Sequence, residues 1–382
     1  MTSAAGWVEV DTRAVGHNLD VVLAHLAGGP TVCAVLKADA YGHGIDLVAP
    51  VVVAAGVGVV GVTANHEAGA VREAGFAGRI LRLRPALADE IADGLAHGIE
   101  EWVGGAEHAR VVQDAAAAHG RRIRVHVSLN STGLSRDGIP LETGAGRQAL
   151  AAIGRMPGLD VIGVCAHFPC EDVTDVAQGA RAFAVEAAQA AEALTARGGE
   201  SHATRPLAFH CATTFAALAV PDSHFDMVRI GAALYGDSAL LGGRLRPAMR
   251  VVTRVAALND YPAGSTAGYG RAHRVRADAR LAVVPLGYAD GYHRVLGRRA
   301  EVLIRGRRAR VVDRLAMNTF LVDVSAVAGA AIGDEVVVYG AQGDDAITSG
   351  EIERVTGEIA ADLYTAWGRL LPRKPAVAAS VG

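Results

Sequence analysis

The stretch Ala34–Gly44 reads AVLKADAYGHG, an apolar run that ends at Lys37 and gives way to a polar loop with two glycines. Together with the preceding TVC, the run predicts a buried strand over residues 31–37. A lysine at a strand end is most often solvated, because burial of an ammonium group is costly. Inside a pocket, however, desolvation lowers the pKa of the amine and makes it a nucleophile toward carbonyl groups. Lys37 is therefore a candidate Schiff-base residue.

The strand at 31–37 is the first of eight similar units. Short β-branched runs alternate with alanine-rich stretches of helical spacing up to about residue 230. The predicted strands cover residues 31–37, 57–63, 79–84, 99–105, 123–129, 160–168, 206–211 and 226–231. Parallel strands need crossover helices, so eight such units predict an α/β fold of the (β/α)8 TIM-barrel type. A doubly wound open sheet is the alternative, but the glycine fingerprint typical of that fold does not follow the first strand.

The pattern changes after about residue 240, where strand patterns follow one another without long helices between them. We therefore expect a barrel over residues 1–240 and a mainly β C-terminal domain over residues 241–382. The first residues, up to about residue 10, are candidates for pairing with the β domain. The basic run RGRRAR at 305–310 lies between two strand patterns, which predicts a solvated hairpin tip rather than a nucleic-acid contact.

Composition favours a small-molecule partner. The 382 residues carry a formal net charge of −3, which does not favour nucleic acid or an anionic membrane. The apolar segment Leu47–Ala64 has almost a membrane-spanning length, but Pro50 and three glycines divide it into a helix end, a turn and a buried strand. The four cysteines form no C-x-x-C pair, no zinc motif occurs, and the N-terminus lacks a signal-peptide pattern. We therefore expect a cytoplasmic protein.

Catalytic groups of such barrels lie at the C-terminal ends of the strands. Polar residues follow five of the eight predicted strands: Lys37, Asn130 with Arg136, His167, Thr213 with Thr214, and Arg229. Each has a structural alternative, such as a hydrogen-bonded core histidine, a helix N-cap or an ion pair. Hydroxyls at a helix start and the glycine-containing turn RIGAALYG would also suit a phosphate. A lysine with a phosphate site indicates pyridoxal phosphate, although a sugar-phosphate aldolase fits both features equally well.

Four motifs then occur in order, AVLKADAYGHG, HFDMVRIGAALYG, AGYGRAHR and VPLGYADGYHR. With a barrel followed by a β domain, they closely resemble the alanine racemase family over nearly the whole chain. The resemblance implies that Lys37 holds pyridoxal phosphate and acts as acid and base on one face of the substrate Cα. It implies the same role on the opposite face for Tyr269, which in this family reaches in from the partner subunit. A homodimer with active sites completed across the interface is therefore implied.

The resemblance also implies roles for other residues. By similarity Arg229 faces the pyridine nitrogen and, with His167, favours the phenolate of Tyr269. The implied cofactor-binding residues are Lys37, Tyr41, His167, Thr214, Arg229, Gly231 and Tyr364. The implied substrate-binding residues, near the substrate carboxylate or at the substrate entrance, are Arg136, Tyr288, Met317 and Asn318. No metal is implied.

Two departures from the family pattern concern the substrate. Strict alanine racemases usually have K-x-D-T-G-M-x-R-x-G after the fifth strand, whereas this chain has VSLNSTGLSRDG with Ser128 in place of the lysine. They also tend to have C-M-D later, where this chain has AMN with Asn318. Both regions look more like the broad-specificity amino-acid racemases. We therefore predict an amino-acid racemase with a relaxed range that includes Ala, Ser, Met, Lys and Arg.

Three alternatives remain. The first is an alanine racemase with a strict alanine preference. The second is a basic amino-acid decarboxylase with the same cofactor, but that chemistry protonates one face only and does not need Tyr269 opposite Lys37. The third is a pyridoxal-phosphate carrier or regulatory protein, which would look like the barrel alone, so residues 241–382 argue against it.

Overall fold

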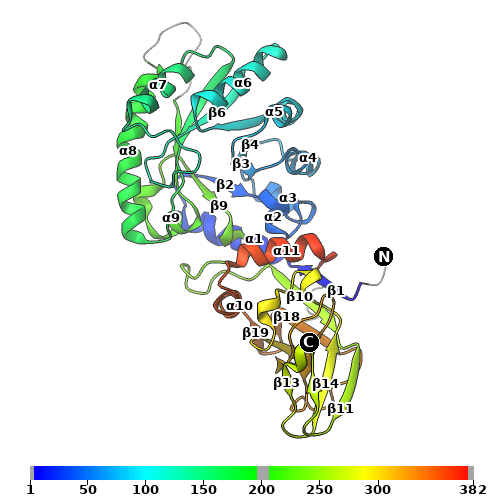
Figure 1. Cartoon of the computed structure of the whole chain (residues 1–382). Coiled ribbons are helices and arrows are strands. Elements are labelled where there is room, and N and C mark those ends of the chain that lie inside the picture. The colour runs from blue at the N-terminus through cyan, green and yellow to red at the C-terminus, as the bar shows by residue number, and fades with distance from the viewer. Residues whose placement is uncertain (1–3, 196–205, 377–382) are drawn as a thin grey trace. The chain divides into compact units, whose positions relative to one another are not determined.

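The computed structural model describes residues 4–195 and 206–376 (Figure 1). The chain forms two compact units. The first, here called the barrel unit, comprises Gly16–Ala38 and Val48–Leu245. The second, here called the β unit, comprises the described residues up to Val15 together with Asp39–Leu47 and the chain from Arg246 onward. The loop that directly follows Lys37 thus packs with the C-terminal part of the chain.

The barrel unit contains the eight parallel strands that the sequence predicts. They are β2 (Thr31–Val35), β3 (Val59–Val62), β4 (Arg79–Arg82), β5 (Ile99–Val103), β6 (Ile123–Ser128), β7 (Leu159–Cys165), β8 (Ala208–His210) and β9 (Met227–Ile230). Their order is β8-β7-β6-β5-β4-β3-β2-β9, and all neighbours are parallel. Hydrogen bonds from Asp226 N to Phe209 O and from Arg229 N to Ala212 O, both 3.0 Å, bring the outer strands together. The result is a nearly closed barrel, which confirms the predicted (β/α)8 fold.

Helices follow these strands and surround them in Figure 1. They are α3 (Ile45–Ala54), α4 (Asn65–Glu73), α5 (Ala88–Gly94), α6 (Ala106–Ala118), α7 (Gly144–Ile153), α8 (Val173–Thr195) and α9 (Thr214–Ala219), and α1 (Thr12–His25) precedes β2. The apolar segment Leu47–Ala64 contains most of α3, with Pro50 inside the helix, then a turn with Gly56 at φ 70°, and β3, so its helical part is longer than the predicted helix end. Among the described residues, no helix is both long and apolar enough to cross a membrane.

The predicted strands extend too far at their C-terminal ends, and the first case matters most. β2 ends at Val35, so Lys37 does not end a strand but begins the one-turn element α2 (Lys37–Tyr41). The four residues Ala38–Tyr41 all have φ between 53° and 55°, which makes this a left-handed turn. Such a backbone costs roughly 1–2 kcal/mol per non-glycine residue, so the surrounding structure must hold it in place. Composition does not signal this turn, because alanine and tyrosine seldom adopt it.

The β unit is built on one large, mainly antiparallel sheet. Its main order is β11-β14-β17-β16-β15-β18-β10-β1-β20. These strands are β1 (Gly6–Val10), β10 (Met249–Arg254), β11 (Ala257–Tyr261), β14 (Ala279–Val284), β15 (Glu301–Ile304), β16 (Arg307–Val311), β17 (Phe320–Asp323), β18 (Glu335–Gln342) and β20 (Arg373–Pro375). β19 (Asp345–Ile347) pairs with β18, and β12 (Thr266–Ala267) forms a separate hairpin with β13 (His273–Arg274). The N-terminal strand β1 pairs antiparallel with β10.

Two features of the β unit differ from the prediction. The hairpin tip between β15 and β16 is only Arg305–Gly306, and the remaining residues of RGRRAR, 307–310, belong to β16. The helices α10 (Ser349–Thr356) and α11 (Ala360–Leu370) have no counterpart among the predicted elements. α11 is amphipathic, and its buried face, including Leu363, Tyr364 and Trp367, completes the core of the β unit.

Candidate functional site

Lys37 lies in an environment that suits a nucleophilic amine. Burial, followed by the positive charges of Arg136 and Arg229, lowers the pKa of Lys37 below its ordinary value. Three strands of the barrel unit supply these groups, since Lys37 follows β2, Arg136 follows β6 and Arg229 lies in β9. The C-terminal ends of parallel barrel strands meet at one end of the barrel, which explains why residues far apart in sequence act on one amine.

Arg229 is buried and held by several partners rather than by an ion pair. Its side chain is 5% exposed, and Nη2 donates to the carbonyl oxygens of Ala166 at 2.8 Å and Cys211 at 3.0 Å. Nη2 also lies 3.2 Å from His167 Nδ1. The guanidinium carbon sits 5.6 Å from the ring centroid of Trp102, in cation–π contact. These contacts fix the orientation of a cation that always donates and does not give up its proton.

A chain of buried polar groups extends from Arg229 into the barrel. Arg229 Nη1 lies 2.7 Å from His210 Nδ1, and His210 Nε2 lies 2.9 Å from His126 Nδ1. His126 Nε2 in turn lies 3.1 Å from an oxygen of Glu100. His210, His126 and Glu100 are fully buried, and burial lowers the pKa of each histidine. Sequence reasoning missed these three residues, although each is a polar residue within or at the edge of a predicted strand that is otherwise largely apolar.

The predicted phosphate residues of the barrel unit lie together. Thr213 is the N-cap of α9, and its hydroxyl accepts a hydrogen bond from Ala216 N at 3.4 Å. The hydroxyl of Thr214 accepts from Gly231 N at 3.1 Å, which joins the start of α9 to the turn after β9. The N-cap alternative therefore holds for Thr213, while Thr214 and Gly231 form a small cluster of backbone and hydroxyl groups.

Tyr41 and Tyr364 both belong to the β unit, where the loop after Lys37 packs against α11. A Cβ added to Gly42 would collide with the carbonyl group of Tyr364, so only glycine permits this close approach. The Tyr364 hydroxyl lies 2.7 Å from the Tyr339 hydroxyl, and its ring is in edge contact with His43. Asp39 accepts a hydrogen bond from Ile45 N at 2.8 Å and forms an ion pair with Arg373.

The loop after Lys37 also contains a buried histidine. His43 is fully buried, and its Nδ1 lies 3.0 Å from Ala40 O and 3.1 Å from Tyr41 O. Burial lowers the pKa of His43 to about 4. The ring is therefore neutral, and its Nδ1–H donates to carbonyl oxygens of the left-handed turn. These contacts, together with the Asp39–Arg373 ion pair, hold the strained turn after Lys37.

Tyr269 lies on an exposed turn of the β unit. The 3-10 turn Tyr269–Arg271 follows Gly268 at φ 74° and contains Gly270 at φ 67°. The residue is 67% exposed. Gly268 packs closely against Asp313, where any added side chain would collide. The structure thus presents Tyr269 at the surface of the unit that carries it.

The predicted substrate-entrance residues of the β unit are neighbours. Ala289 N donates to Met317 O at 2.9 Å and Tyr288 N donates to Ala316 O at 3.3 Å, which links the two segments. The side-chain amide of Asn318 lies 3.5 Å from Asp290 Oδ2. Tyr288 and Met317 are both exposed, at 42% and 56%. Arg136, the remaining predicted substrate residue, is exposed in the barrel unit and lies 3.4 Å from Asp137 Oδ2.

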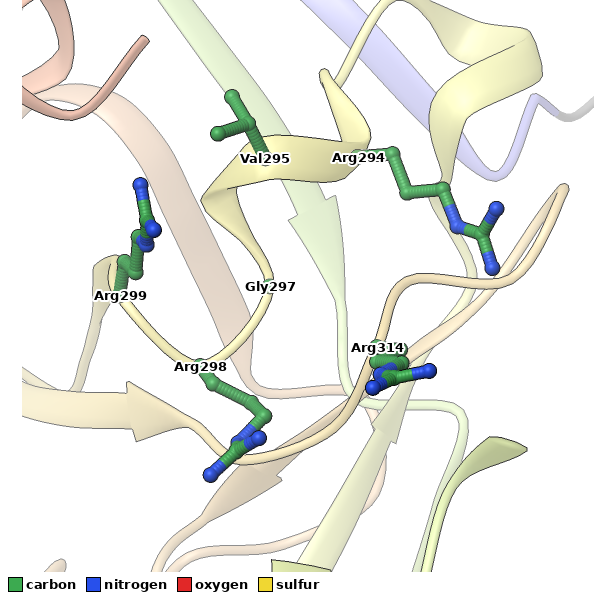
Figure 2. Close-up of a pocket in the computed structure, with 6 residues that line it drawn as sticks. All are labelled: Arg294, Val295, Gly297, Arg298, Arg299 and Arg314. Atoms are coloured by element: carbon green, nitrogen blue, oxygen red, sulfur yellow. The ribbon is translucent and has the colours of Figure 1, made fainter. Parts of the chain in front are cut away.

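A pocket in the β unit is lined mainly by arginine, and sequence reasoning did not identify it. Figure 2 shows its lining residues, Arg294, Val295, Gly297, Arg298, Arg299 and Arg314. Its volume is about 570 Å³, within the range of small-molecule pockets. Arg314 Nη1 lies 3.6 Å from the position of a Cβ on Gly270, so the pocket adjoins the Tyr269 turn. The segment GYHRVLGRR in the sequence is the signal that could have revealed it.

The comparisons with known proteins agree with this architecture. Residues 10–239 match the family described as alanine racemase, N-terminal domain, and residues 248–375 match alanine racemase, C-terminal domain. A relative named broad specificity amino-acid racemase, from Aeromonas hydrophila subsp. hydrophila, is 41% identical over 98% of this chain and 90% of its own length. A lysine racemase from Proteus mirabilis is 35% identical over 95% of this chain and 87% of its own length.

A solved structure gives the same result at the level of the fold. The crystal structure of alanine racemase from D-cycloserine-producing Streptomyces lavendulae superposes with a TM-score of 0.86 at 30% identity, covering 99% of each chain. The two family domains account for the two units in the same order along the chain. The chain therefore belongs to the alanine racemase family.

Proposed function

We propose that this chain is a pyridoxal-phosphate-dependent racemase that interconverts the L and D forms of several amino acids. The observation that carries the proposal is the amine of Lys37, whose pKa is lowered by burial and by Arg136 and Arg229 at one end of a (β/α)8 barrel. A decarboxylase would share the lysine, but the second base at Tyr269 would then have no role. Family membership and the names of the relatives support racemisation over that alternative.

The residues present suit this cofactor. Arg229 is a fixed donor for the ring nitrogen, and the Thr214–Gly231 cluster at the start of α9 suits the phosphate. The indole Nε1 of Trp102 is buried without a hydrogen-bond partner in the described part of the chain, so a further donor remains beside Arg229. We also assign Tyr41, Tyr364 and His167 to cofactor binding, which extends the family's motif positions to this chain.

When bound, pyridoxal phosphate withdraws electrons from the substrate and makes the Cα proton removable. Lys37 holds the cofactor and moves a proton at Nζ on one face of Cα, for which its lowered pKa is an advantage at neutral pH. Tyr269 moves a proton at its hydroxyl on the opposite face. Arg229 keeps its own proton and so leaves the ring nitrogen unprotonated, which limits electron withdrawal and restrains side reactions.

The second base implies a homodimer. Tyr269 is 67% exposed on the turn that carries it, a high value for a residue assigned to proton transfer. We propose that this turn inserts into the active site of a second copy, where burial against that copy removes the phenol from bulk water. Each active site would then combine Lys37 of one subunit with Tyr269 of the other.

The substrate range follows from the charge and size of the entrance. Arg136 is proposed to bind the substrate carboxylate, as a donor that suits a carboxylate geometry. Ser128, in β6 of the barrel unit, and Asn318, in the β unit, stand where strict alanine racemases have a lysine and an acidic residue, so both positions are neutral in this chain. Neutral groups there admit longer side chains, in agreement with the relatives named broad specificity amino-acid racemase and lysine racemase.

The test is a substrate panel. Purified protein is loaded with pyridoxal phosphate and incubated with single enantiomers of Ala, Ser, Met, Lys, Arg and Glu, and both enantiomers are quantified by chiral chromatography. Conversion of several amino acids to racemates supports the proposal. Conversion of alanine alone would contradict the relaxed range, and release of carbon dioxide with an amine product would replace racemisation by decarboxylation. Lys37→Ala serves as the control for background racemisation.

A further inference from the structure

The hydrogen bonds that link the buried groups from Arg229 to Glu100 all run in one direction, and the groups at the two ends determine that direction. A guanidinium can only donate hydrogen bonds, so His210 Nδ1, which lies 2.7 Å from Arg229 Nη1, must accept. The proton of His210 is therefore on Nε2 and points to His126 Nδ1 at 2.9 Å. His126 in turn carries its proton on Nε2, where it faces an oxygen of Glu100 at 3.1 Å. A carboxylate can only accept, so both ends require the same arrangement.

The reverse direction would remove the support of Arg229. If His126 carried its proton on Nδ1, His210 would have to accept at Nε2 and would present an N–H group to the guanidinium. Two donors would then face each other in a buried site, which is costly because neither has water as an alternative partner. The geometry thus makes the position of two protons decisive for how Arg229 is held.

The residues around Glu100, His126 and His210 hold these groups closely in place. Glu100, His126 and His210 are all fully buried in the barrel unit, and an added Cβ on Gly163 would collide with the His126 ring. Trp102 packs at the Arg229 end of the network, in edge contact with His210 and in cation–π contact with Arg229. At the far end, Arg79 donates to both oxygens of Glu100 at 2.9 Å. Burial opposes ionisation of Glu100, but the hydrogen bonds from His126 and Arg79 outweigh it and lower the pKa of Glu100 to about 2, so the carboxylate is charged.

We propose that Glu100 is a positioning residue for Arg229. Its carboxylate fixes the direction of the hydrogen bonds through His126 and His210, so that His210 offers a lone pair to the guanidinium. This inference rests on the proposed function only in that Arg229 contacts the cofactor ring. Glu100 acts through two imidazole rings and touches neither cofactor nor substrate.

The adjacent residue provides a matched control. Glu101 is also buried in β5 and is also held by an arginine, with Arg82 Nε 2.7 Å from one oxygen and Nη2 3.1 Å from the other. Successive residues of a strand point to opposite faces, so Glu101 is directed away from the histidine chain. The substitutions Glu100→Gln and Glu101→Gln remove the same charge from neighbouring buried positions. Only Glu100→Gln allows an amide N–H to face His126 and so permits the reverse direction.

The experiment measures the histidine protons directly. Holoenzyme labelled with ¹⁵N-histidine is examined by magic-angle-spinning NMR in the wild type and both variants, and signals are assigned by His126→Gln and His210→Gln. We expect both rings to carry their proton on Nε2 in the wild type and in Glu101→Gln. In Glu100→Gln we expect a population with the proton on Nδ1 in both rings. We also expect kcat to fall by about 10- to 100-fold, with little change in KM. This is the range seen for residues that orient metal ligands without contacting the metal.

The outcomes separate this inference from the proposed function. Unchanged ring protonation in Glu100→Gln, or equal effects of Glu101→Gln on ring protonation and kcat, would overturn the role of Glu100. A wild-type His210 with its proton on Nδ1 would overturn it even if the variant fails to fold. A wild-type protein that neither takes up pyridoxal phosphate nor racemises any amino acid would instead contradict the proposed function, while the ring protonation would still test the hydrogen-bond direction.

Discussion

Nη2 of Arg229 lies 3.2 Å from Nδ1 of His167, and the pKa of His167 is lowered to about 3 by burial and then by the charge of Arg229. His167 is therefore neutral at physiological pH and accepts a hydrogen bond from the guanidinium. The cation available to favour the phenolate of Tyr269 in the proposed site is accordingly Arg229 and not His167.

The first prediction concerns acid unfolding. Between pH 6.5, the ordinary pKa of histidine, and about 3, the unfolded chain binds a proton at residue 167 that the folded chain does not. Stability is therefore lost as pH falls through this range, by up to about 1.4 kcal/mol per pH unit from this residue. His167→Asn keeps an acceptor for Arg229 and should flatten the pH dependence of the free energy of unfolding. Urea unfolding at pH 7, 6, 5 and 4 and at fixed protein concentration measures it, and parallel curves for wild type and variant would refute the assignment.

The second prediction concerns the loop after Lys37. Gly42 has φ 77° and packs against the backbone of Tyr364, whereas Gly56 has φ 70° and open space around its Cβ position. Gly56→Ala should cost only the left-handed backbone penalty of about 1–2 kcal/mol. Gly42→Ala should cost several kcal/mol more or displace the left-handed turn, with weaker uptake of pyridoxal phosphate. Thermal unfolding and cofactor titration compare the two variants, and equal losses would show that the contact with α11 is unimportant.

The third prediction concerns the amine of Lys37. Arg136 is the second-largest cause of its lowered pKa after burial, so Arg136→Met should raise that pKa. The rate at which cofactor-free protein takes up pyridoxal phosphate depends on the neutral amine. Its pH profile, followed by visible absorption, should therefore shift to higher pH in Arg136→Met. A profile that coincides with that of the wild type would mean that the charge of Arg136 does not reach the amine.

The fourth prediction concerns the arginine-lined pocket beside the Tyr269 turn. A cluster of positive charge disfavours a substrate with a cationic side chain more than a neutral one. Arg314→Gln should raise the ratio of kcat/KM for L-Lys over L-Ala by roughly threefold at low salt, and added salt should abolish the difference. Arg307→Gln, in β16 and outside the pocket lining, is the control with the same change in charge. If Arg314→Gln and Arg307→Gln gave equal ratios of kcat/KM for L-Lys over L-Ala, the pocket would have no influence on the choice of substrate.

Much of the fold could be predicted because its signals are local. Alternation of β-branched runs with amphipathic stretches is sufficient for eight strands and their helices, and β6 and β9 lie within one residue of their predicted bounds at each end. Strand ends are less predictable, as Lys37 shows, because a left-handed turn of Ala and Tyr depends on contacts with the distant residues Arg373 and Tyr364.

The candidate site likewise contains residues that could be predicted from the sequence and residues that could not. Lys37, Thr214, Arg229 and Gly231 could be proposed because reactive groups follow predicted strands, and Tyr269 because a family motif contains it. Glu100 and His126 could not be proposed, since their importance lies in their contact with each other and in the link through His210 to Arg229, across the four strands β5, β6, β8 and β9. A polar residue inside an apolar strand is the only local sign of such a network.

The central claim is that Lys37 and Tyr269 act on opposite faces of Cα. Its most direct test is deuterium incorporation at Cα from heavy water with Tyr269→Phe holoenzyme, started separately from L-Ala and D-Ala and analysed by chiral chromatography with mass detection. We predict that one enantiomer still exchanges its proton with retention, through Lys37, while inversion and exchange of the other enantiomer are lost. Inversion of both enantiomers at near wild-type rates would contradict the two-base account.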